Sequence, residues 1–240
     1  MQSLDIILPC YNPEPHWAQN IVQEYERVRQ AIPDLEHKLI IVNDGSSKGV
    51  EDLDVVHLKE NIPNLEYLSY TQNQGKGYAL RHGIAKSTAD YSVFTDIDFP
   101  YESESLIHLF KTLQNGPDIV IGVRDESYYE NVPKGRVRIS KVFKFFLKNF
   151  FRLPVSDTQC GLKGFNAEGR VIFLESTMNR YLFDLEFIFL ASRRRAIKLT
   201  SVPVKLKPGI VFSKKSMKIL SQEGRSFLKI FVKSLFQPRK

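Results

Sequence analysis

The sequence contains few of the residues and patterns that mark secreted, zinc-binding or membrane-spanning proteins. Its 240 residues include two cysteines, Cys10 and Cys160, which cannot make a disulfide framework, and no Cys/His spacing is typical of a zinc site. No run reaches the roughly 18 apolar residues of a spanning helix. The first residues lack the basic and apolar regions of a signal peptide. We therefore expect a protein of the reducing cytoplasm, without a leader or a membrane span.

The bulk composition is that of an ordinary globular protein. Hydrophobic residues make up 42% and charged residues 25%, so the chain can bury a core of normal size. No Pro/Gly/Ser-rich linker divides the sequence. We therefore predict one domain over residues 1–240.

Positive charge is concentrated in two places. The whole chain has a net charge of +7. Residues 205–240 contribute +9 to it, so residues 1–204 together carry a net charge of −2. Residues 134–152 contain seven Lys/Arg and no acid. In both basic segments apolar residues recur at three/four spacing beside a basic stripe. We expect contact with an anionic membrane surface; a core-facing helix with a solvated basic side is the alternative. No motif accompanies the charge that would indicate nucleic acid.

Short β-rich runs alternate with helical patterns over the first half of the chain. We predict strands at 4–9, 38–42, 65–70, 91–95 and 119–122, and helices at 18–32, 50–59, 76–86 and 105–114. This alternation predicts an α/β fold with a mostly parallel central sheet flanked by helices. Ligands then bind beyond the carboxyl ends of the strands.

Two acids follow the apolar run that ends at Thr95. Asp96 and Asp98 are two residues apart, so in an extended chain their carboxylates point the same way. Mg²⁺ or Mn²⁺ accepts a few carboxylate oxygens and keeps positions for substrate phosphates. The pair therefore indicates a metal-bound diphosphate. Two solvated acids at a strand end are the alternative.

Other polar residues follow neighbouring predicted strands, and each also has a plain structural explanation. Asp44, within Asn43–Ser47, either contacts a base or ribose or forms a turn. Arg124 either pairs with diphosphate or is a surface arginine. The run 73–77, Asn-Gln-Gly-Lys-Gly, either cradles phosphate at a helix N-terminus or caps and packs that helix closely.

Two later motifs are also candidates. The run 157–161, Asp-Thr-Gln-Cys-Gly, indicates a tight loop near the substrate or a capped turn, with Cys160 a buried apolar group rather than a nucleophile. Asp184 and Glu186 begin an apolar helix, where residues two apart diverge. At most one of them then points into a site, and an acid favouring the helix dipole is the alternative.

In their order and spacing these motifs resemble those of family 2 glycosyltransferases of the GT-A fold, and within them the polyprenyl-phosphate (dolichyl-phosphate) mannose and glucose synthases. The resemblance runs from about Leu4 to Lys214. It rests on Leu8–Asn12, Val42–Ser47, Asn73–Gly77 with Ala79 and Gly83, Asp96–Asp98, Gly122–Arg124, Arg136 with Ser140, Asp157–Gly161, Val202–Val204 and Ser213–Lys214. The run 157–161 looks more like the glucose-transferring branch.

The resemblance implies a role for individual residues. Pro9, Tyr11, Glu14, Val42 and Asp44 line the nucleoside pocket. Asp96 and Asp98 hold Mg²⁺ or Mn²⁺ on the diphosphate of a GDP- or UDP-hexose, with Ile97 beside them. Arg124, Arg136 with Ser140, and Lys214 meet phosphates of the donor or the acceptor. Residues 1–125 then form the nucleotide-sugar-binding half, and residues 126–240 the half that faces acceptor and membrane.

The sequence departs from the family pattern in places. In the family a glutamate directly follows Tyr-Asn, whereas here Pro13 lies between Asn12 and Glu14. Phe99-Pro100 replaces the Leu-Gln that often follows the two acids. Gly209 occupies a position where the family usually has an arginine. Many relatives also have transmembrane helices. We therefore expect this chain to attach to the membrane through its basic segments or through a membrane-embedded partner subunit.

The expected reaction is transfer of a hexose, with inversion, to a polyprenyl phosphate at the cytoplasmic membrane face. A phosphate acceptor is already anionic near neutral pH and needs no base. A sugar hydroxyl needs one, and Asp157 and Glu186 are the candidates. Two alternatives remain: extension of a cell-envelope glycan through a sugar hydroxyl, and a non-catalytic membrane adaptor that keeps the fold.

Overall fold

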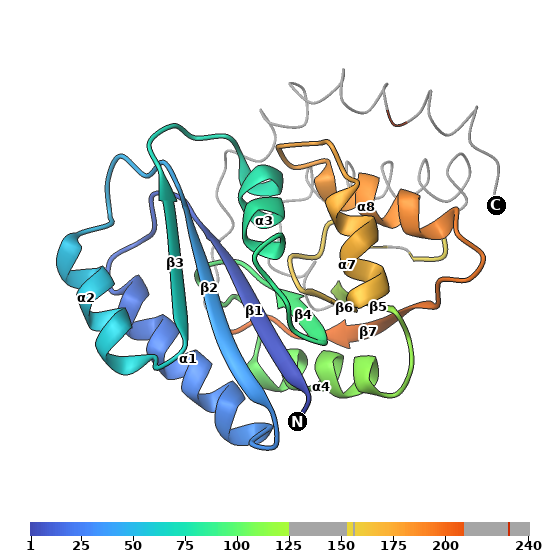
Figure 1. Ribbon diagram of the computed structural model, residues 1–240, viewed down its shortest axis with the longest axis horizontal. Coiled ribbons are helices and arrows are strands. Elements are labelled where there is room, and N and C mark those ends of the chain that lie inside the picture. Colours follow the sequence, from blue (N-terminus) through green and yellow to red (C-terminus); the bar gives the residue numbers. More distant parts are fainter. Residues whose placement is uncertain (125–152, 156, 209–229, 231–240) are drawn as a thin grey trace.

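A central sheet of seven strands organises the molecule, for which a computed structural model describes residues 1–124, 153–155, 157–208 and 230 (Figure 1). The strands are β1 (Ser3–Cys10), β2 (Glu36–Asp44), β3 (Leu65–Tyr70), β4 (Tyr91–Phe94), β5 (Ile119–Arg124), β6 (Lys163–Asn166) and β7 (Leu199–Val204). The helices are α1 (Trp17–Ala31), α2 (Asp52–Asn61), α3 (Lys76–Ile84), α4 (Ser103–Gln114), α7 (Ala167–Leu174) and α8 (Phe183–Ser192).

The sheet is mostly parallel, as the sequence predicts. Its order is β3-β2-β1-β4-β6-β5-β7. Among the strands of the described residues, only β6 runs against its neighbours, pairing antiparallel with both β4 and β5. All five strands and all four helices expected over the first half of the chain are present, as is the apolar helix expected at Asp184 and Glu186, which is α8; β6, α7 and β7 are additions.

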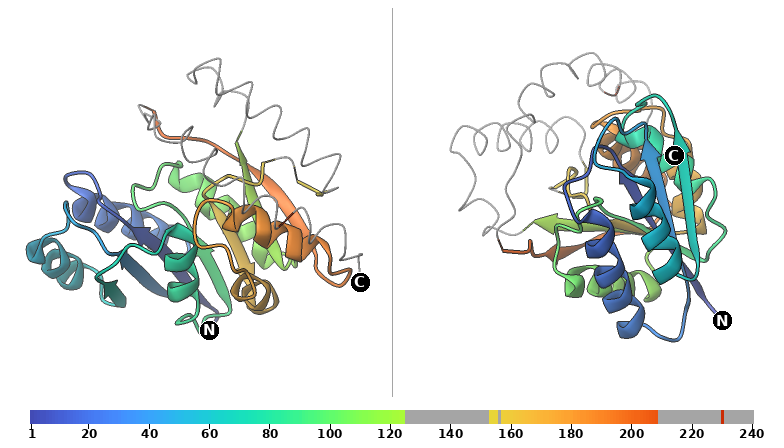
Figure 2. Two further views of the ribbon diagram at one scale, coloured as in Figure 1. Left: turned by 90° about the horizontal axis from the view of Figure 1, so that it is seen from above. Right: turned by 90° about the vertical axis from the view of Figure 1, so that its left-hand side faces the viewer.

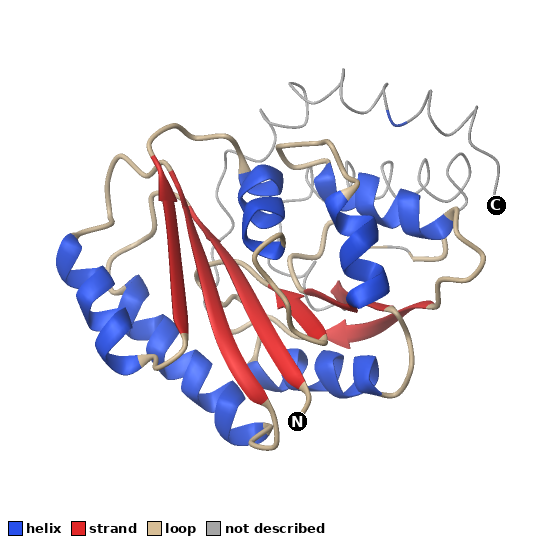
Figure 3. Ribbon diagram, viewed as in Figure 1, coloured by secondary structure: helices blue, strands red, loops and turns tan. Residues whose placement is uncertain are grey.

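Helices cover both faces of the sheet, which explains why its strands are apolar on both sides (Figure 3). Alternate residues of β1 divide between two cores. Leu4, Ile6 and Leu8 pack in the core with α1, α2 and α4, whereas Ile7 packs in the core with α3, α7 and α8. The left-hand view of Figure 2 shows these two helix groups on opposite sides.

The order of the strands places a topological switch point at the carboxyl ends of β1 and β4. From β1 the chain adds β2 and then β3 on one side, and β4 then joins β1 on the other side. The connections from β1 and β4 therefore diverge, and such a switch point is where open α/β sheets bind ligands. The acid pair follows β4 at this position.

Candidate active site

Loops from three strands meet at this edge of the sheet. The backbone of Asn12 is left-handed, and its Oδ1 accepts hydrogen bonds from the Ser47 and Lys48 amides at 2.9 and 3.2 Å. Gly45 has a φ of +64°, and a Cβ there would come within 2.6 Å of the Asn73 amide nitrogen. The loops after β1, β2 and β3 are thus in direct contact at one edge of the sheet.

A tight turn presents the acid pair. The Phe99 amide donates to the Asp96 carbonyl at 3.0 Å, and Phe99 has a φ of +44° although it is a buried aromatic residue. Such backbone is strained and persists only where packing enforces it, most often at functional sites. The turn leaves the side chain of Asp96 37% exposed and Asp98 exposed. Both carboxylates are therefore within reach of a ligand.

The electrostatics of the pair depend on the repulsion between the two acids and on the nearby ammonium of Lys76. Desolvation and the nearby charge of Asp96 raise the pKa of Asp98. The Lys76 ammonium, at the first residue of α3, forms an ion pair with Asp96 Oδ1. Sequence reasoning did not place Lys76 beside Asp96, which is 20 residues away in the sequence. Its position in the run 73–77, at the start of a predicted helix, was the signal that could have indicated it.

The loop 157–161 closes the other side of Asp96. A Cβ at Gly161 would lie 2.4 Å from Asp96 Oδ2. The Gly161 amide donates to the Tyr101 hydroxyl at 2.9 Å, and the Cys160 thiol donates to the same hydroxyl at 3.3 Å. The loop is thus buried beside the acid pair. Tyr101, which sequence reasoning did not select, fixes it there.

Arg124 and Asp157 form an ion pair at the end of β5. Arg124 Nε and Nη2 donate to the two oxygens of Asp157 at 2.8 and 2.7 Å, and the Arg124 amide adds a bond of 3.1 Å. The Asp157 side chain is 2% exposed and that of Arg124 is 15% exposed. The two predicted site residues therefore hold each other in place.

Asp44 is buried and organises the loop that leads into α3. Its carboxylate accepts from the Tyr70 hydroxyl at 2.8 Å, the Asn73 side-chain amide at 2.8 Å, and the backbone amides of Gln74 and Gly75 at 2.7 and 2.9 Å. Asp44 is 2% exposed, and its hydrogen bonds stabilise the loop before α3. Its direct contact with a base or ribose stays a prediction.

The start of α3 is capped by protein. The amides of Gly77 and Tyr78 both donate to the Asn179 carbonyl, at 2.8 and 3.2 Å. A Cβ at Gly77 would lie 2.4 Å from the Met178 carbonyl oxygen. These contacts favour the interpretation of the run 73–77 as a cap with close packing over a phosphate cradle.

The two acids of α8 diverge, as predicted. Glu186 accepts from the amides of Thr177 and Met178 at 2.7 and 2.8 Å, which fixes the segment that caps α3. Asp184 accepts from the buried Lys163 ammonium at 2.5 Å. Each acid thus has a buried partner.

The remaining predicted residues divide by position. Pro9 and Val42 are buried in β1 and β2, Ile97 is half-buried, and Tyr11 and Glu14 are exposed in the loop after β1. Arg136, Ser140 and Lys214 lie outside the described residues, as do residues 134–152 and nearly all of the basic C-terminal segment.

The acid pair suits Mg²⁺ or Mn²⁺ bound together with a diphosphate. Asp96 and Asp98 offer hard oxygen donors on an accessible turn. Within the described ranges no group of three or more His, Cys, Asp or Glu side chains could form a cage of protein ligands. Such a sparse donor set fits ions that take one or two carboxylates and complete their shell with phosphate and water.

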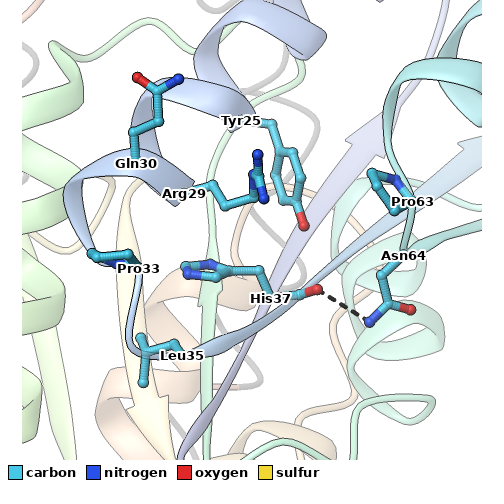
Figure 4. A pocket seen from close by; sticks show the side chains of 8 residues that line it. All are labelled: Tyr25, Arg29, Gln30, Pro33, Leu35, His37, Pro63 and Asn64. Carbon is cyan, nitrogen blue, oxygen red and sulfur yellow. Dashed lines mark hydrogen bonds between the residues drawn. The ribbon is translucent and has the colours of Figure 1, made fainter.

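A separate hollow of about 310 Å³ lies at the opposite end of the strands (Figure 4). It is lined by the end of α1, the start of β2 and the segment before β3, where the Asn64 side chain donates to the His37 carbonyl at 3.1 Å. Its lining contains no carboxylate, so we place the site at the acid pair instead.

Comparisons with known proteins identify the family of this chain. The sequence profile of the family described as "Glycosyl transferase family 2" matches residues 5–170. The dolichyl-phosphate beta-glucosyltransferase of Dictyostelium discoideum is 27% identical over 205 residues, covering 79% of this chain and 62% of that protein. A prophage bactoprenol glucosyl transferase homolog of Escherichia coli is 29% identical over 125 residues, covering 51% of this chain and 39% of that protein.

Solved structures share the fold. Mannosyl-3-phosphoglycerate synthase from Rubrobacter xylanophilus has a TM-score of 0.62 at 13% identity, covering 98% of this chain and 74% of that one. Mannosyltransferase PcManGT from Pyrobaculum calidifontis, in complex with GDP-Man and Mn²⁺, has a TM-score of 0.57 at 17% identity, covering 83% and 54%. These likenesses confirm the GT-A fold.

The chain spans about three fifths of the length of the dolichyl-phosphate relative. Across the described residues, no helix combines the length and apolar character needed to cross a bilayer.

Proposed function

Because the chain belongs to glycosyl transferase family 2, we propose that it transfers a hexose from a nucleotide-diphosphate sugar to a polyprenyl phosphate. Relatives of this chain are named dolichyl-phosphate beta-glucosyltransferase and bactoprenol glucosyl transferase, so glucose is the proposed hexose. The donor is a UDP- or GDP-hexose.

The donor's diphosphate is proposed to bind at this switch point, in the crevice expected between the loops that follow β1 and β4. Asp96 and Asp98 would hold a Mg²⁺ or Mn²⁺ ion there, and the bound ion would neutralise charge that develops on the leaving diphosphate. Arg124 offers a cation at the end of β5, held in one orientation by its two bonds to Asp157. A preorganised cation of this kind stabilises a charged transition state without having to reorganise.

The proposal of a phosphate acceptor is supported mainly by the burial and the hydrogen bonds of the two candidate bases, Asp157 and Glu186. The carboxylate of Asp157 is bound by Arg124 through both of its oxygens and is 2% exposed. Glu186 is fully buried and accepts three hydrogen bonds from Thr177 and Met178. A sugar hydroxyl would need a base within reach. A phosphate monoester carries its own negative charge near neutral pH and attacks without one.

The proposed place of action is the cytoplasmic face of a membrane. Residues 134–152 and 205–240 supply the basic charge that anionic lipid attracts, at about 1 kcal/mol for each cation near the surface. Peripheral binding through these segments, or through a membrane-embedded partner subunit, would bring the lipid phosphate to the crevice.

A comparison of acceptors tests the proposal. The purified chain is incubated with Mn²⁺ or Mg²⁺, a panel of radiolabelled UDP- and GDP-hexoses, and either undecaprenyl phosphate, dolichyl phosphate or undecaprenol. We expect label in the lipid product only when the lipid carries phosphate. Equal labelling of undecaprenol, or labelling of a glycan acceptor alone, would show that a hydroxyl is the nucleophile. No transfer from any donor would support the adaptor alternative.

A further inference from the structure

The Lys76 ammonium lies at the acid pair. It forms an ion pair with Asp96 Oδ1, while the backbone at Gly161 closes on Oδ2 of the same carboxylate. A dication that takes an oxygen of Asp96 therefore meets a positive charge already placed there. Like charges at such short range repel strongly in a partly desolvated site.

The backbone beneath Lys76 is fixed. Gly75 has a φ of +102° and donates to Asp44 at 2.9 Å, and the amides of Gly77 and Tyr78 donate to Asn179. A Cβ at Gly75 would lie 2.5 Å from the Asn179 carbonyl oxygen, so the two segments pack closely here. The four-carbon side chain of Lys76 is the part that can move.

The surroundings of Lys76 favour its charged form. Desolvation lowers its pKa, but the charges of Asp96, Asp184 and Asp98 outweigh that effect and raise it. Its ammonium is also 5.9 Å from the centre of the Phe183 ring, a contact that favours a cation. A cation released from Asp96 remains beside the crevice, where a diphosphate brings new negative charge.

We propose that Lys76 is a resident counter-ion of the metal site: it neutralises Asp96 in the empty protein and transfers to the donor's diphosphate when the dication binds Asp96. The inference rests on the proposed function, since it assumes that metal and diphosphate meet at this pair. It assigns Lys76 to donor binding and explains how two adjacent acids stay together without metal. It also makes metal binding depend on the nucleotide, because Lys76 then exchanges one anionic partner for another.

Metal affinity measured with and without nucleotide tests this exchange. Binding of Mn²⁺ is followed by electron paramagnetic resonance, alone and with saturating UDP or GDP, in wild type, Lys76→Met and Lys76→Arg. We expect Lys76→Met to bind Mn²⁺ alone at least fivefold more tightly, since no cation must leave. In the presence of Mn²⁺, we expect the same variant to bind the nucleoside diphosphate at least fivefold more weakly. Lys76→Arg, which keeps the charge, is expected to stay near wild type in both.

Lys38→Met is the matched control. Lys38 also pairs with a carboxylate, Glu66, at 2.5 Å and with similar exposure, but it lies at the start of β2, away from the crevice. Its loss is expected to leave both affinities unchanged.

The outcomes separate the two proposals. Lys76→Met that binds Mn²⁺ no more tightly than wild type, or that binds nucleotide equally well, would overturn the role of Lys76 while leaving the proposed function standing. A wild-type protein that binds no Mn²⁺ even with UDP or GDP would overturn both. A purely structural role for Lys76 would weaken both affinities together, which also contradicts the exchange.

Discussion

Gly161 lies directly against the carboxylate of Asp96, since a Cβ at Gly161 would come within 2.4 Å of Asp96 Oδ2. The loop 157–161 and the acid pair are thus one unit, although Gly161 follows Asp96 by 65 residues in the sequence. The burial of this loop sets the position of Asp96.

Gly161→Ala is therefore expected to displace Asp96. Inserting a methyl group into packed structure costs about 1–3 kcal/mol, and here the shift falls on a proposed metal ligand. We expect the Mn²⁺ concentration needed for half-maximal transfer to rise about tenfold or more. Gly116→Ala is the control, because a Cβ at Gly116 meets open space, so any loss there comes from backbone strain at its φ of +113° and not from a displaced neighbour. A Gly161→Ala protein with wild-type metal dependence would contradict the close contact.

Asp44→Asn is expected to lower stability even without nucleotide. The buried carboxylate accepts at both oxygens, so an amide nitrogen would face a donor whichever way it turned. Leaving buried donors unsatisfied costs about 1–3 kcal/mol. Urea unfolding of the ligand-free protein measures this, with the exposed Asp34→Asn as control. Unchanged stability together with lost nucleotide binding would mean that Asp44 serves the ligand alone.

The acid pair was predictable from sequence because its signal is local. Apolar runs mark β1 and β4, and the polar residues that follow them predict which edge of the sheet binds ligand. Strand β6 was missed for the opposite reason. Its sequence, Lys-Gly-Phe-Asn, has no strand pattern, and its buried Lys163 depends on Asp184, 21 residues away.

Contacts within the candidate site also depend on residues far apart in the sequence and could not be predicted from it. The structural duty of Asp44 depends on Tyr70 and Asn73, and the cap of α3 depends on Asn179. No spacing rule in the sequence links these residues, because the links pass through the folded sheet. What sequence does predict correctly is the divergence of Asp184 and Glu186, since that follows from helix geometry alone.

Lys163→Met is expected to be strongly destabilising. The Lys163 side chain is fully buried and its ammonium has Asp184 and the Cys160 carbonyl as partners, each at 2.5 Å. Removing one member of a buried pair costs about 3–5 kcal/mol because the other charge is left unpaired. In contrast, Lys38→Met at the half-exposed pair with Glu66 should cost about 0–1 kcal/mol.

The double variant Lys163→Met/Asp184→Leu should recover part of this loss, as measured by the midpoint of urea unfolding. A double variant no more stable than Lys163→Met would show that the pair matters for shape rather than for charge.

Both cysteines are expected to resist alkylation in the folded protein. Burial raises the pKa of Cys10 to about 12 and also raises that of Cys160. The reactive thiolate is populated only as pH approaches the pKa, so at pH 8 the thiolate fraction of Cys10 falls about a thousandfold below that of an exposed thiol with a pKa of about 9. Mass spectrometry after iodoacetamide treatment should find both thiols unmodified in native protein and modified in urea. Rapid labelling of native Cys160 would reopen a chemical role for it.

The most direct test of the account follows labelled glucose into lipid with the acid pair intact and broken. Wild type and Asp98→Ala are each given the productive nucleotide sugar, undecaprenyl phosphate and Mn²⁺, and label is counted in the organic phase. Asp98 is exposed, so its loss should leave the fold intact while the rate falls about 100-fold or more. We predict label with wild type that disappears with a chelator and with Asp98→Ala. Equal transfer by the two proteins, with or without metal, would contradict the central claim.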